Sequence, residues 1–470
     1  MQLKKPWEPL ACRCMRKRIT TTMYQSPNTN TRPRQYFATP KTSSNSCPEE
    51  PECPQDRPFN GFRMARTNAA YDVVQDVHRQ VQTYEMHRIR SRKRRPKDQS
   101  TFERQIESLV CDLVHREITN PGAWVAISFS KQVLGRKDRY RPAALAETLP
   151  AVIRHMASPE LEFLEMKKGL RNPFDNTLSR QTTIRAGKRL KDRIKEYQLL
   201  LDDFELEKTQ EIIILKDTKE DLWDAGKWLQ YGDTEQTVAY RNELSLINDW
   251  IEKADIDYIL PYETSTFVDT SDRKLRRYFN NNCFEHGGRL FGGFWQHMTR
   301  HMRQGIVIDG MDTVTLDYGQ MIARVLYGYA GVPFEFDDAY RVPGLESCRD
   351  GVKKVFSAML YADRPLNRMP HGTRDLFPSK FSYADVADKI MQFHKPVAEF
   401  LYAGVGPRLT YLESKILVMV LTKLIEQGIT ALPIHDAVIV AEQHNEATIK
   451  TMLEVFKDLT GIDGLVSLDE

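Results

Sequence analysis

Two apolar runs in the C-terminal half of the chain each contain a single aspartate. The runs are Val-Thr-Leu-Asp317-Tyr and Leu-Pro-Ile-His-Asp436-Ala-Val-Ile-Val. Short apolar runs rich in β-branched residues are typical of buried strands. A carboxylate inside such a strand is costly unless it is paired or binds a metal ion. The pattern therefore predicts two strands whose aspartates have a charged partner or a metal.

A helix with a cationic face is predicted between these strands. Arg349 and Lys353 are four residues apart, and residues at that spacing lie on one face of a helix. A further helix precedes Asp436, because apolar residues recur at helical spacing over 412–424 and Gly428 follows as a stop. Two carboxylates beside a cationic helix are what a phosphoryl-transfer site requires.

Residues 101–190 are predicted to form a small separate domain. Ser100 has capping-box spacing before an apolar-periodic helix, and a second helix is expected over about 142–156. Residues 161–166 and 181–185 then predict two strands. Helices followed by a two-stranded wing resemble a winged helix, a module that presents a helix to a DNA groove. A small helical packing module is the alternative.

Residues 1–100 are predicted to be a disordered basic tail and linker, because residues 1–60 are rich in Pro, Ser, Thr and Asn. A weakly helical stretch is expected over 70–82. Residues 88–97 contain seven cations and no acid. A solvated linker and contact with a phosphate backbone are both open interpretations of this run. The cations assigned to nucleic acid are Arg92, Lys93, Arg94 and Arg95.

The composition adds limits to this picture. The chain has 470 residues, of which 41% are hydrophobic and 28% charged, which suits several domains with ordinary cores. A net charge of +3 is too small to bind nucleic acid by a global field, so local cationic patches are needed. The seven cysteines predict reduced thiols, with zinc at the N-terminal ones as an alternative. No apolar run is long enough to predict a membrane span.

The order of these segments resembles the palm and fingers of family A DNA polymerases and of the related single-subunit RNA polymerases. The resemblance implies an α+β fold over residues 266–470, with a right-hand palm built on an antiparallel sheet and with helical fingers. Residues 191–265 would be a helical linker or a thumb-like segment. The winged-helix-like domain and the disordered N-terminal tail would precede them.

The first matching motif begins at Asp317. Family members have an Asp-Tyr-Ser-Gln-x-Glu run at this point, and this chain matches it at Asp317, Tyr318 and Gln320, with a further match at Arg324. The resemblance implies that Asp317 holds both metal ions and that the backbone carbonyl of Tyr318 holds one. Gln320, Ile322 and Arg324 would line the nucleotide site. Ile322 replaces the glutamate that excludes ribose, which leaves the choice of sugar open.

The second motif is the fingers helix. The family has Arg, then Lys four residues later, an aromatic residue four after that, and Tyr-Gly. This chain matches at Arg349, Lys353 and Tyr361 but has Ser357 in place of the aromatic residue and Ala362 in place of glycine. The resemblance implies that Arg349 and Lys353 bind the triphosphate and that Tyr361 stacks against the templating pair.

Two further motifs complete the resemblance. His435-Asp436 is similar to the family's His-Asp-Glu hairpin, although Ala437 replaces the glutamate. Asp436 would be the second metal-binding carboxylate, and His435 would contact the primer end. Gly-Gly288-Arg289-Leu is similar to a Thr-Gly-Arg-Leu run whose arginine reads the minor groove at the primer end.

The function implied is template-directed nucleotidyl transfer to a nucleic-acid 3′ end with two Mg²⁺ ions, in the service of DNA synthesis for a small replicon or mobile element. The expected partners are a DNA primer-template and nucleoside triphosphates, with no membrane; protein partners stay unidentified. A primase or RNA polymerase that uses rNTPs is one alternative, and a non-catalytic DNA-binding replication initiator is another. The expected location is the cytoplasm, in a bacterial or phage context, with organelle targeting by the basic N-terminus left open.

Overall fold

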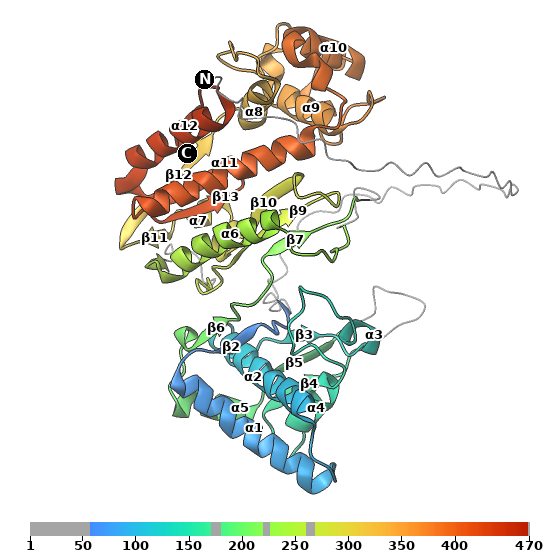
Figure 1. The fold of residues 1–470 in the computed structure, drawn as a ribbon, viewed down its shortest axis with the longest axis vertical. Coiled ribbons are helices and arrows are strands. Elements are labelled where there is room, and N and C mark those ends of the chain that lie inside the picture. The colour runs from blue at the N-terminus through green and yellow to red at the C-terminus, as the bar shows by residue number, and fades with distance from the viewer. Residues whose placement is uncertain (1–56, 171–179, 220–225, 260–267, 469–470) are drawn as a thin grey trace, which may run out of the picture. The chain divides into compact units, whose positions relative to one another are not determined.

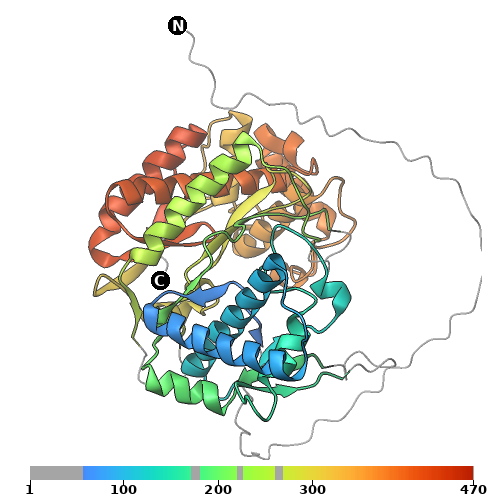
Figure 2. The ribbon, with the colours of Figure 1, turned by 60° about the horizontal axis from the view of Figure 1, so that its bottom comes forward.

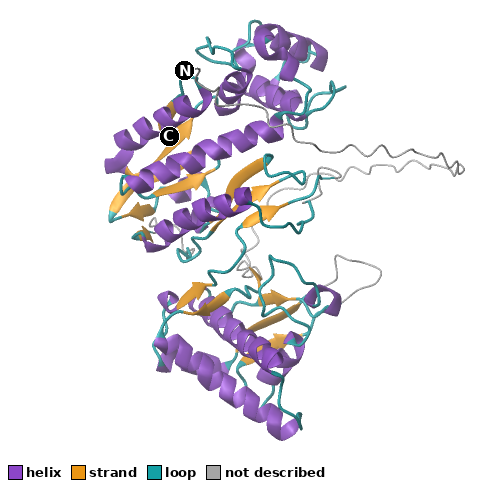
Figure 3. Ribbon diagram, viewed as in Figure 1, coloured by secondary structure: helices purple, strands orange, loops and turns teal. Residues whose placement is uncertain are grey.

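The computed structural model describes residues 57–170, 180–219, 226–259 and 268–468. In these residues, helices alternate with several small sheets whose strands are mostly antiparallel (Figure 3). The chain is therefore an α+β protein. The tail predicted for the first 56 residues, with its four cysteines, lies outside the described residues.

Two long helices pack against each other in the N-terminal part. They are α1 (Asn68–Arg88) and α2 (Pro96–Thr119), which lie side by side in Figures 1 and 2. α1 buries valines three and four positions apart, including Val73, Val77 and Val81, so it presents one apolar stripe. That stripe belongs to the same hydrophobic core as the buried residues of α2.

Short strands and helices complete the N-terminal part. Three strands form an antiparallel sheet in the order β3-β5-β4, and β1 adds to β3 in parallel. A separate pair joins β2 to β6. The bounds are β1 Arg57–Pro58, β2 Arg63–Ala65, β3 Val125–Ile127, α3 Lys131–Leu134, α4 Leu149–Met156, β4 Leu164–Lys167, β5 Thr182–Ala186, α5 Lys188–Glu196 and β6 Phe204–Leu206. The two strands predicted in this region are confirmed as β4 and β5.

Three predictions for this part need correction. Residues 57–100 are not a linker, since they form β1, β2, α1 and the start of α2. The weakly helical stretch expected over 70–82 is confirmed as part of α1, which is longer because its buried stripe of valines continues in a polar helix. α2 begins at Pro96 rather than at Ser100, because the missing N–H of proline costs nothing in a first turn. α4 begins at Leu149 rather than near residue 142, since a longer helix would place Pro150 in its interior.

The largest sheet lies in the C-terminal part. Its strand order is β13-β14-β12-β11-β8, and β15 pairs with β12 in addition; every pairing in it is antiparallel. The bounds are β8 Ile256–Tyr258, β11 Ile306–Ile308, β12 Met311–Tyr318, β13 Ala431–Ile434, β14 Ala437–Ala441 and β15 Val466–Leu468. A second sheet has the order β10-β9-β7, from strands β7 Ile213–Leu215, β9 Leu275–Phe279 and β10 Gly287–Gly292.

Helices pack against the strands of both sheets. α11 contacts β10, α6, α8 and α12, so it is the central helix of the C-terminal part (Figure 1). Buried leucines, isoleucines and valines recur along most of its length, which is why it occupies that position. The bounds are α6 Glu235–Lys253, α7 Arg300–Arg303, α8 Met321–Ala330, α9 Arg349–Tyr361, α10 Tyr383–Phe393, α11 Gly406–Glu426 and α12 Asn445–Thr460.

Several predictions for the C-terminal part are confirmed. The two aspartate-bearing runs are β12 and the β13–β14 hairpin, the cationic helix is α9, and the helix before Asp436 is α11. The helix expected within the segment 191–265 is present as α6, but the same segment also gives one strand to each of three sheets through β6, β7 and β8. Its strands are only three residues long, too short for a clear alternation. No helix in the described part of the chain is long and apolar enough to cross a membrane.

Candidate active site

The two aspartates lie on neighbouring strands. Asp317 is the penultimate residue of β12, and Asp436 lies in the turn that joins β13 to β14. β12 pairs with β14 in a register that sets Asp317 opposite Ala437, the residue after Asp436. Both aspartates are half-buried. Antiparallel pairing thus brings together two carboxylates that are more than 100 residues apart in the sequence.

The chain turns sharply on either side of this pair. His435 precedes Asp436 in a left-handed conformation with φ of 54°, which gives the hairpin its tight turn. Its exposed ring lies edge-on to Phe291 of β10, with ring centres 6.0 Å apart. The predicted primer-end histidine therefore lies between the β13–β14 hairpin and β10.

Two residues predicted to contact the nucleotide have other partners. The side-chain amide of Gln320 donates to the carbonyl of Asp337 at 2.9 Å and accepts from the N–H of Ala339 at 2.8 Å. Arg324 donates to the carbonyl of Asp463 at 2.7 Å and covers the ring of Phe334. Both side chains are thus held by the protein's own backbone, and their assignment to the nucleotide site stays a prediction. Gln320 also begins α8 in a left-handed conformation.

The fingers-like helix presents its cations outward. Lys353 is exposed, while Val352, Val355 and Phe356 face the core. The Nε of Arg349 donates to an oxygen of Asp338 at 2.6 Å. Burial alone would raise the pKa of Asp338, but the hydrogen bonds from Arg349 and from the N–H of Tyr340, together with the charges of Arg349 and Arg341, hold that pKa below its ordinary value. The contact with Asp338 thus fixes the position of Arg349, while part of the arginine side chain stays exposed to solvent.

Tyr361 ends α9 against the start of α11. Its hydroxyl shares a hydrogen bond with the hydroxyl of Thr410, and its ring lies over Gly406. A Cβ at Gly406 would come within 2.6 Å of that ring. The lack of a side chain at Gly406 therefore allows the two helices to meet.

Arg289 projects from β10 toward the aspartates. Gly288, just before it, has φ of +80°, and a Cβ there would lie 3.2 Å from the ring of Phe279 and 3.3 Å from the hydroxyl of Ser414. A glycine lets β10 approach α11 at this point. Burial would lower the pKa of Arg289, but the carboxylate of Glu413 raises it, and Tyr361 and Asp436 add smaller contributions to the rise. Arg289 and Tyr361 thus both contact α11, and Phe291, two residues beyond Arg289, lies against His435, the residue before Asp436.

Glu413 of α11 belongs to this site and escaped the sequence analysis. Its side chain is only 3% exposed, and its carboxylate pairs with Arg289 at 2.7 Å. Burial is the main cause that raises the pKa of Glu413 to about 7; Asp436 and Asp317 add to the shift, and Arg289 opposes it. The charges of both aspartates thus act on Glu413. The available signal was an acid between the apolar residues Leu412 and Ile416 of a helix.

The cationic run is the loop between α1 and α2. Arg92, Lys93 and Arg95 are exposed there, as a nucleic-acid contact requires. Arg94 is the exception, because its guanidinium pairs with Glu85 and lies 3.6 Å above the ring of Phe102. Arg94 is thus built into the fold, and its assignment to nucleic acid stays a prediction.

The donor set of Asp317 and Asp436 fits Mg²⁺. Proteins usually bind this ion through one or two carboxylates together with substrate phosphates and water. Among the described residues, no group of three or more His, Cys, Asp or Glu is placed to hold a metal ion. The two-carboxylate site would thus depend on substrate for the remaining ligands.

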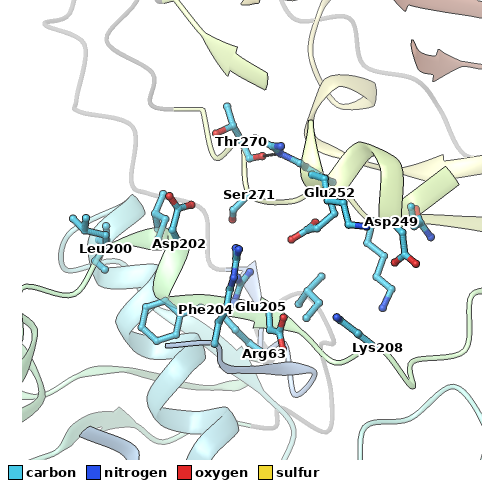
Figure 4. Close-up of a pocket in the computed structure, with 18 residues that line it drawn as sticks. Arg63, Leu200, Asp202, Phe204, Glu205, Lys208, Asp249, Glu252, Thr270 and Ser271 are labelled. Carbon is cyan, nitrogen blue, oxygen red and sulfur yellow. Dashed lines mark hydrogen bonds between the residues drawn. The ribbon is translucent and has the colours of Figure 1, made fainter. Parts of the chain in front are cut away.

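A cavity of about 660 Å³ lies among β2, β6 and the end of α6, away from these residues. Its lining is charged with both signs and includes Arg63, Asp202, Lys208, Asp249 and Glu252 (Figure 4). None of the residues assigned to catalysis or substrate lines it. The candidate site is therefore the open surface at the aspartates and not this cavity.

Comparison with solved structures gives a partial similarity. No family model matches the chain, and no curated protein matches it. The chain is similar to the POL domain of Pol1 from M. smegmatis, whose structure is a complex with DNA primer-template and dNTP. The alignment covers 50% of this chain and 51% of that chain, with 13% identity and a TM-score of 0.28. The chain thus spans about half the length of that domain, and the function proposed below rests on the site residues instead.

Proposed function

We propose that the chain catalyses template-directed nucleotidyl transfer to the 3′ end of a nucleic acid, by a mechanism that uses two Mg²⁺ ions. The observation that carries the proposal is the pairing of β12 with β14, which sets Asp317 beside the Asp436 turn. Two carboxylates on adjacent strands and a helix with outward cations are the parts that phosphoryl transfer needs.

Each residue has a role in this proposal. Asp317, Asp436 and the backbone carbonyl of Tyr318 would hold the ions. Bound Mg²⁺ would supply activation of the 3′-hydroxyl and stabilisation of the leaving pyrophosphate. Arg349 and Lys353 neutralise the triphosphate as negative charge develops on it.

The remaining site residues orient the substrates. Arg289 and His435 contact the primer end. Tyr361 lies against the templating pair, and Ile322, half-buried in the first turn of α8, lies below the sugar. The partners are thus a DNA primer-template and nucleoside triphosphates.

The preferred product is DNA, made for a small replicon or a mobile element. Ile322 fills space beneath the sugar, and a polar 2′-hydroxyl buried against it would lose its hydrogen bonds to water. A primase or RNA polymerase is the second candidate, favoured by the absence of a glutamate at both Ile322 and Ala437. A non-catalytic replication initiator is the third.

The N-terminal part supports recruitment to DNA. Its elements follow the order α2-β3-α3-α4-β4-β5, and β5 lies between β3 and β4 in an antiparallel sheet. We infer that this arrangement is a winged helix. Together with the exposed Arg92, Lys93 and Arg95, it would bind duplex DNA near the primer.

Primer extension on a defined template, with dNTPs and rNTPs compared, tests the function. Asp317→Asn and Asp436→Asn should each slow extension by roughly a hundredfold or more, because several kcal/mol of transition-state stabilisation is lost. DNA affinity should stay within about twofold, since it depends on phosphate contacts elsewhere.

Asp312→Asn is the matched control, because Asp312 is an exposed aspartate of the same strand. Its extension rate should equal that of the wild type. Wild-type rates in both Asp317→Asn and Asp436→Asn would refute the catalytic assignment.

A further inference from the structure

One face of α11 carries small and polar residues, whereas most other buried residues of the helix are apolar. Gly406, Thr410, Glu413 and Ser414 have the spacing i, i+4, i+7 and i+8, so they share that face. Gly406 and Thr410 hold Tyr361, as described above. The hydroxyl of Ser414 donates to the carbonyl of Gly288. This face therefore fixes two substrate-binding segments, the end of α9 and the Gly288–Arg289 stretch of β10.

Glu413 holds Arg289 by one edge of its guanidinium. The Nε and Nη2 atoms both lie 2.7 Å from the same carboxylate oxygen. A guanidinium has five N–H groups, so three stay available to other acceptors. Arg289 keeps 34% of its side chain exposed. The contact thus fixes the guanidinium and leaves its other edge open toward the site.

Without Glu413, Arg289 has a different carboxylate to turn to. Phe291, two residues beyond Arg289 on β10, lies against His435, the residue before Asp436, and a long arginine side chain readily turns to a new partner. An arginine paired with Asp436 would compete with a cation for the same oxygens. A buried glutamate next to two aspartates is unfavourable by charge repulsion, so its presence here needs a compensating role.

We propose that Glu413 is a positioning residue for Arg289: it holds the guanidinium at the primer side of the site and keeps its charge off Asp436, which leaves Asp436 able to bind a cation. The inference rests on the function proposed above and deepens it. Glu413 does not itself ligate the cation in this arrangement, since the described residues contain no cluster of three metal-binding side chains.

Mn²⁺ binding, followed by electron paramagnetic resonance on the full chain without nucleotide, tests the inference without turnover. Glu413→Gln should weaken Mn²⁺ binding by roughly fivefold, a coupling typical within one ion-pair network. The double variant Glu413→Gln with Arg289→Met should bring the affinity back toward the wild-type value, because the displaced positive charge is then gone.

Two further variants sharpen the result. Glu413→Asp keeps the charge and should bind Mn²⁺ more tightly than Glu413→Gln, which guards against a general loss of folding. Glu285→Gln is the matched control, since Glu285 also forms an ion pair with an arginine that contacts α11, in this case Arg408 of the helix itself. It should leave Mn²⁺ affinity unchanged.

The outcomes separate the possibilities. Unchanged Mn²⁺ affinity in Glu413→Gln would overturn the inference, because the charge of Glu413 would then have no effect on the site. A weakened affinity that Arg289→Met does not restore would also overturn it, since Glu413 would act on the cation directly. A wild-type chain that neither binds Mn²⁺ nor extends a primer would refute the proposed function, and the inference with it.

Discussion

Arg92 and Arg94 are two residues apart in one cationic run, yet their surroundings are opposite. Arg92 is exposed, while Arg94 is 10% exposed, paired with Glu85 and stacked on Phe102. Glu85 also accepts a hydrogen bond from the ring of His155 at 2.8 Å. At the scale of single residues, the same side-chain type thus serves the fold at one position and is free for a nucleic-acid contact at the other.

The two arginines should respond differently to replacement. Arg94→Ala is expected to lower the free energy of unfolding by about 2 kcal/mol, because a buried pair and a cation–π contact are lost. Arg92→Ala should change it by less than about 0.5 kcal/mol. Arg92→Ala should instead flatten the salt dependence of DNA binding by about one unit of slope if it removes one phosphate contact.

Urea denaturation and DNA titrations at several salt concentrations measure both effects. An unchanged salt slope in Arg92→Ala would leave that cation a surface residue of the loop. Equal stability of Arg94→Ala and the wild type would contradict the buried environment of Arg94.

Ile322 carries the prediction on sugar choice. The wild-type chain should prefer dNTPs, with weaker discrimination than a glutamate at this position would give. Ile322→Ala should lower the preference further, by up to about tenfold for each 1.4 kcal/mol of lost discrimination. Single-nucleotide insertion with matched dNTP and rNTP provides the measurement. A clear preference of the wild type for rNTPs would favour the primase or RNA polymerase alternative.

At the scale of elements, α11 is the helix on which the site is assembled. It contacts α9, β10 and β13, so three of the segments that carry site residues meet on it. Its apolar residues form the core, and its polar face holds Tyr361 and Arg289. A shift of this helix would therefore displace both substrate-binding segments at once.

Gly406→Ala tests the meeting of α9 and α11. Alanine favours a helix more than glycine does, by about 1 kcal/mol, so an open site would be stabilised. Here the new Cβ would come within 2.6 Å of the Tyr361 ring. The clash should win and lower the free energy of unfolding by about 1–3 kcal/mol, with slower primer extension.

Gly232→Ala serves as the control, because a Cβ there would meet nothing within 4 Å. Thermal unfolding and extension rates of both variants give the comparison. A Gly406→Ala chain more stable than the wild type would contradict the close contact of the helices.

At the scale of the whole molecule, an aromatic cluster joins the elements behind the site. The fully buried ring of His394 lies against Phe336, Phe356 and Phe393, and it contacts Tyr327 of α8. One ring nitrogen lies 2.9 Å from the carbonyl of Ala339 and the other 3.1 Å from the hydroxyl of Tyr327. His394 thus connects α8, α9 and the end of α10 to the loop that Gln320 also holds.

This cluster predicts how stability depends on pH. Burial lowers the pKa of His394 from 6.5 to about 4. Between these values, the unfolded chain binds a proton that the folded chain does not. Stability from this group is therefore complete above pH 6.5 and decreases as the pH falls to about 4, by about 3 kcal/mol in all.

Urea denaturation of the wild type and of His394→Gln from pH 7 to pH 4 measures this effect. The variant should be less stable at pH 7 and should lose less stability over the same range. Parallel pH profiles for the two chains would show that His394 does not cause the dependence.

The sequence alone determined the elements that carry strong local patterns. β12, the β13–β14 hairpin, α9 and α11 were predictable because their apolar residues recur with the period of a strand or helix. The candidate residues on them followed from spacing within one motif or from resemblance. The full length of α1 and the three-residue strands β6, β7 and β8 were not predictable, because short or weakly apolar segments give little periodicity.

The tertiary structure alone decided what each polar side chain touches. Sequence spacing places Gln320, Arg324 and Arg94 on elements suitable for substrate contacts. Only the packing shows that these side chains contact backbone carbonyls, Phe334 or Glu85 of the protein itself. Glu413 reaches Arg289 across 124 residues of sequence, and no local pattern encodes that distance. The physical reason is that periodicity reports which face of an element is buried, whereas ion pairs and hydrogen bonds depend on which elements meet.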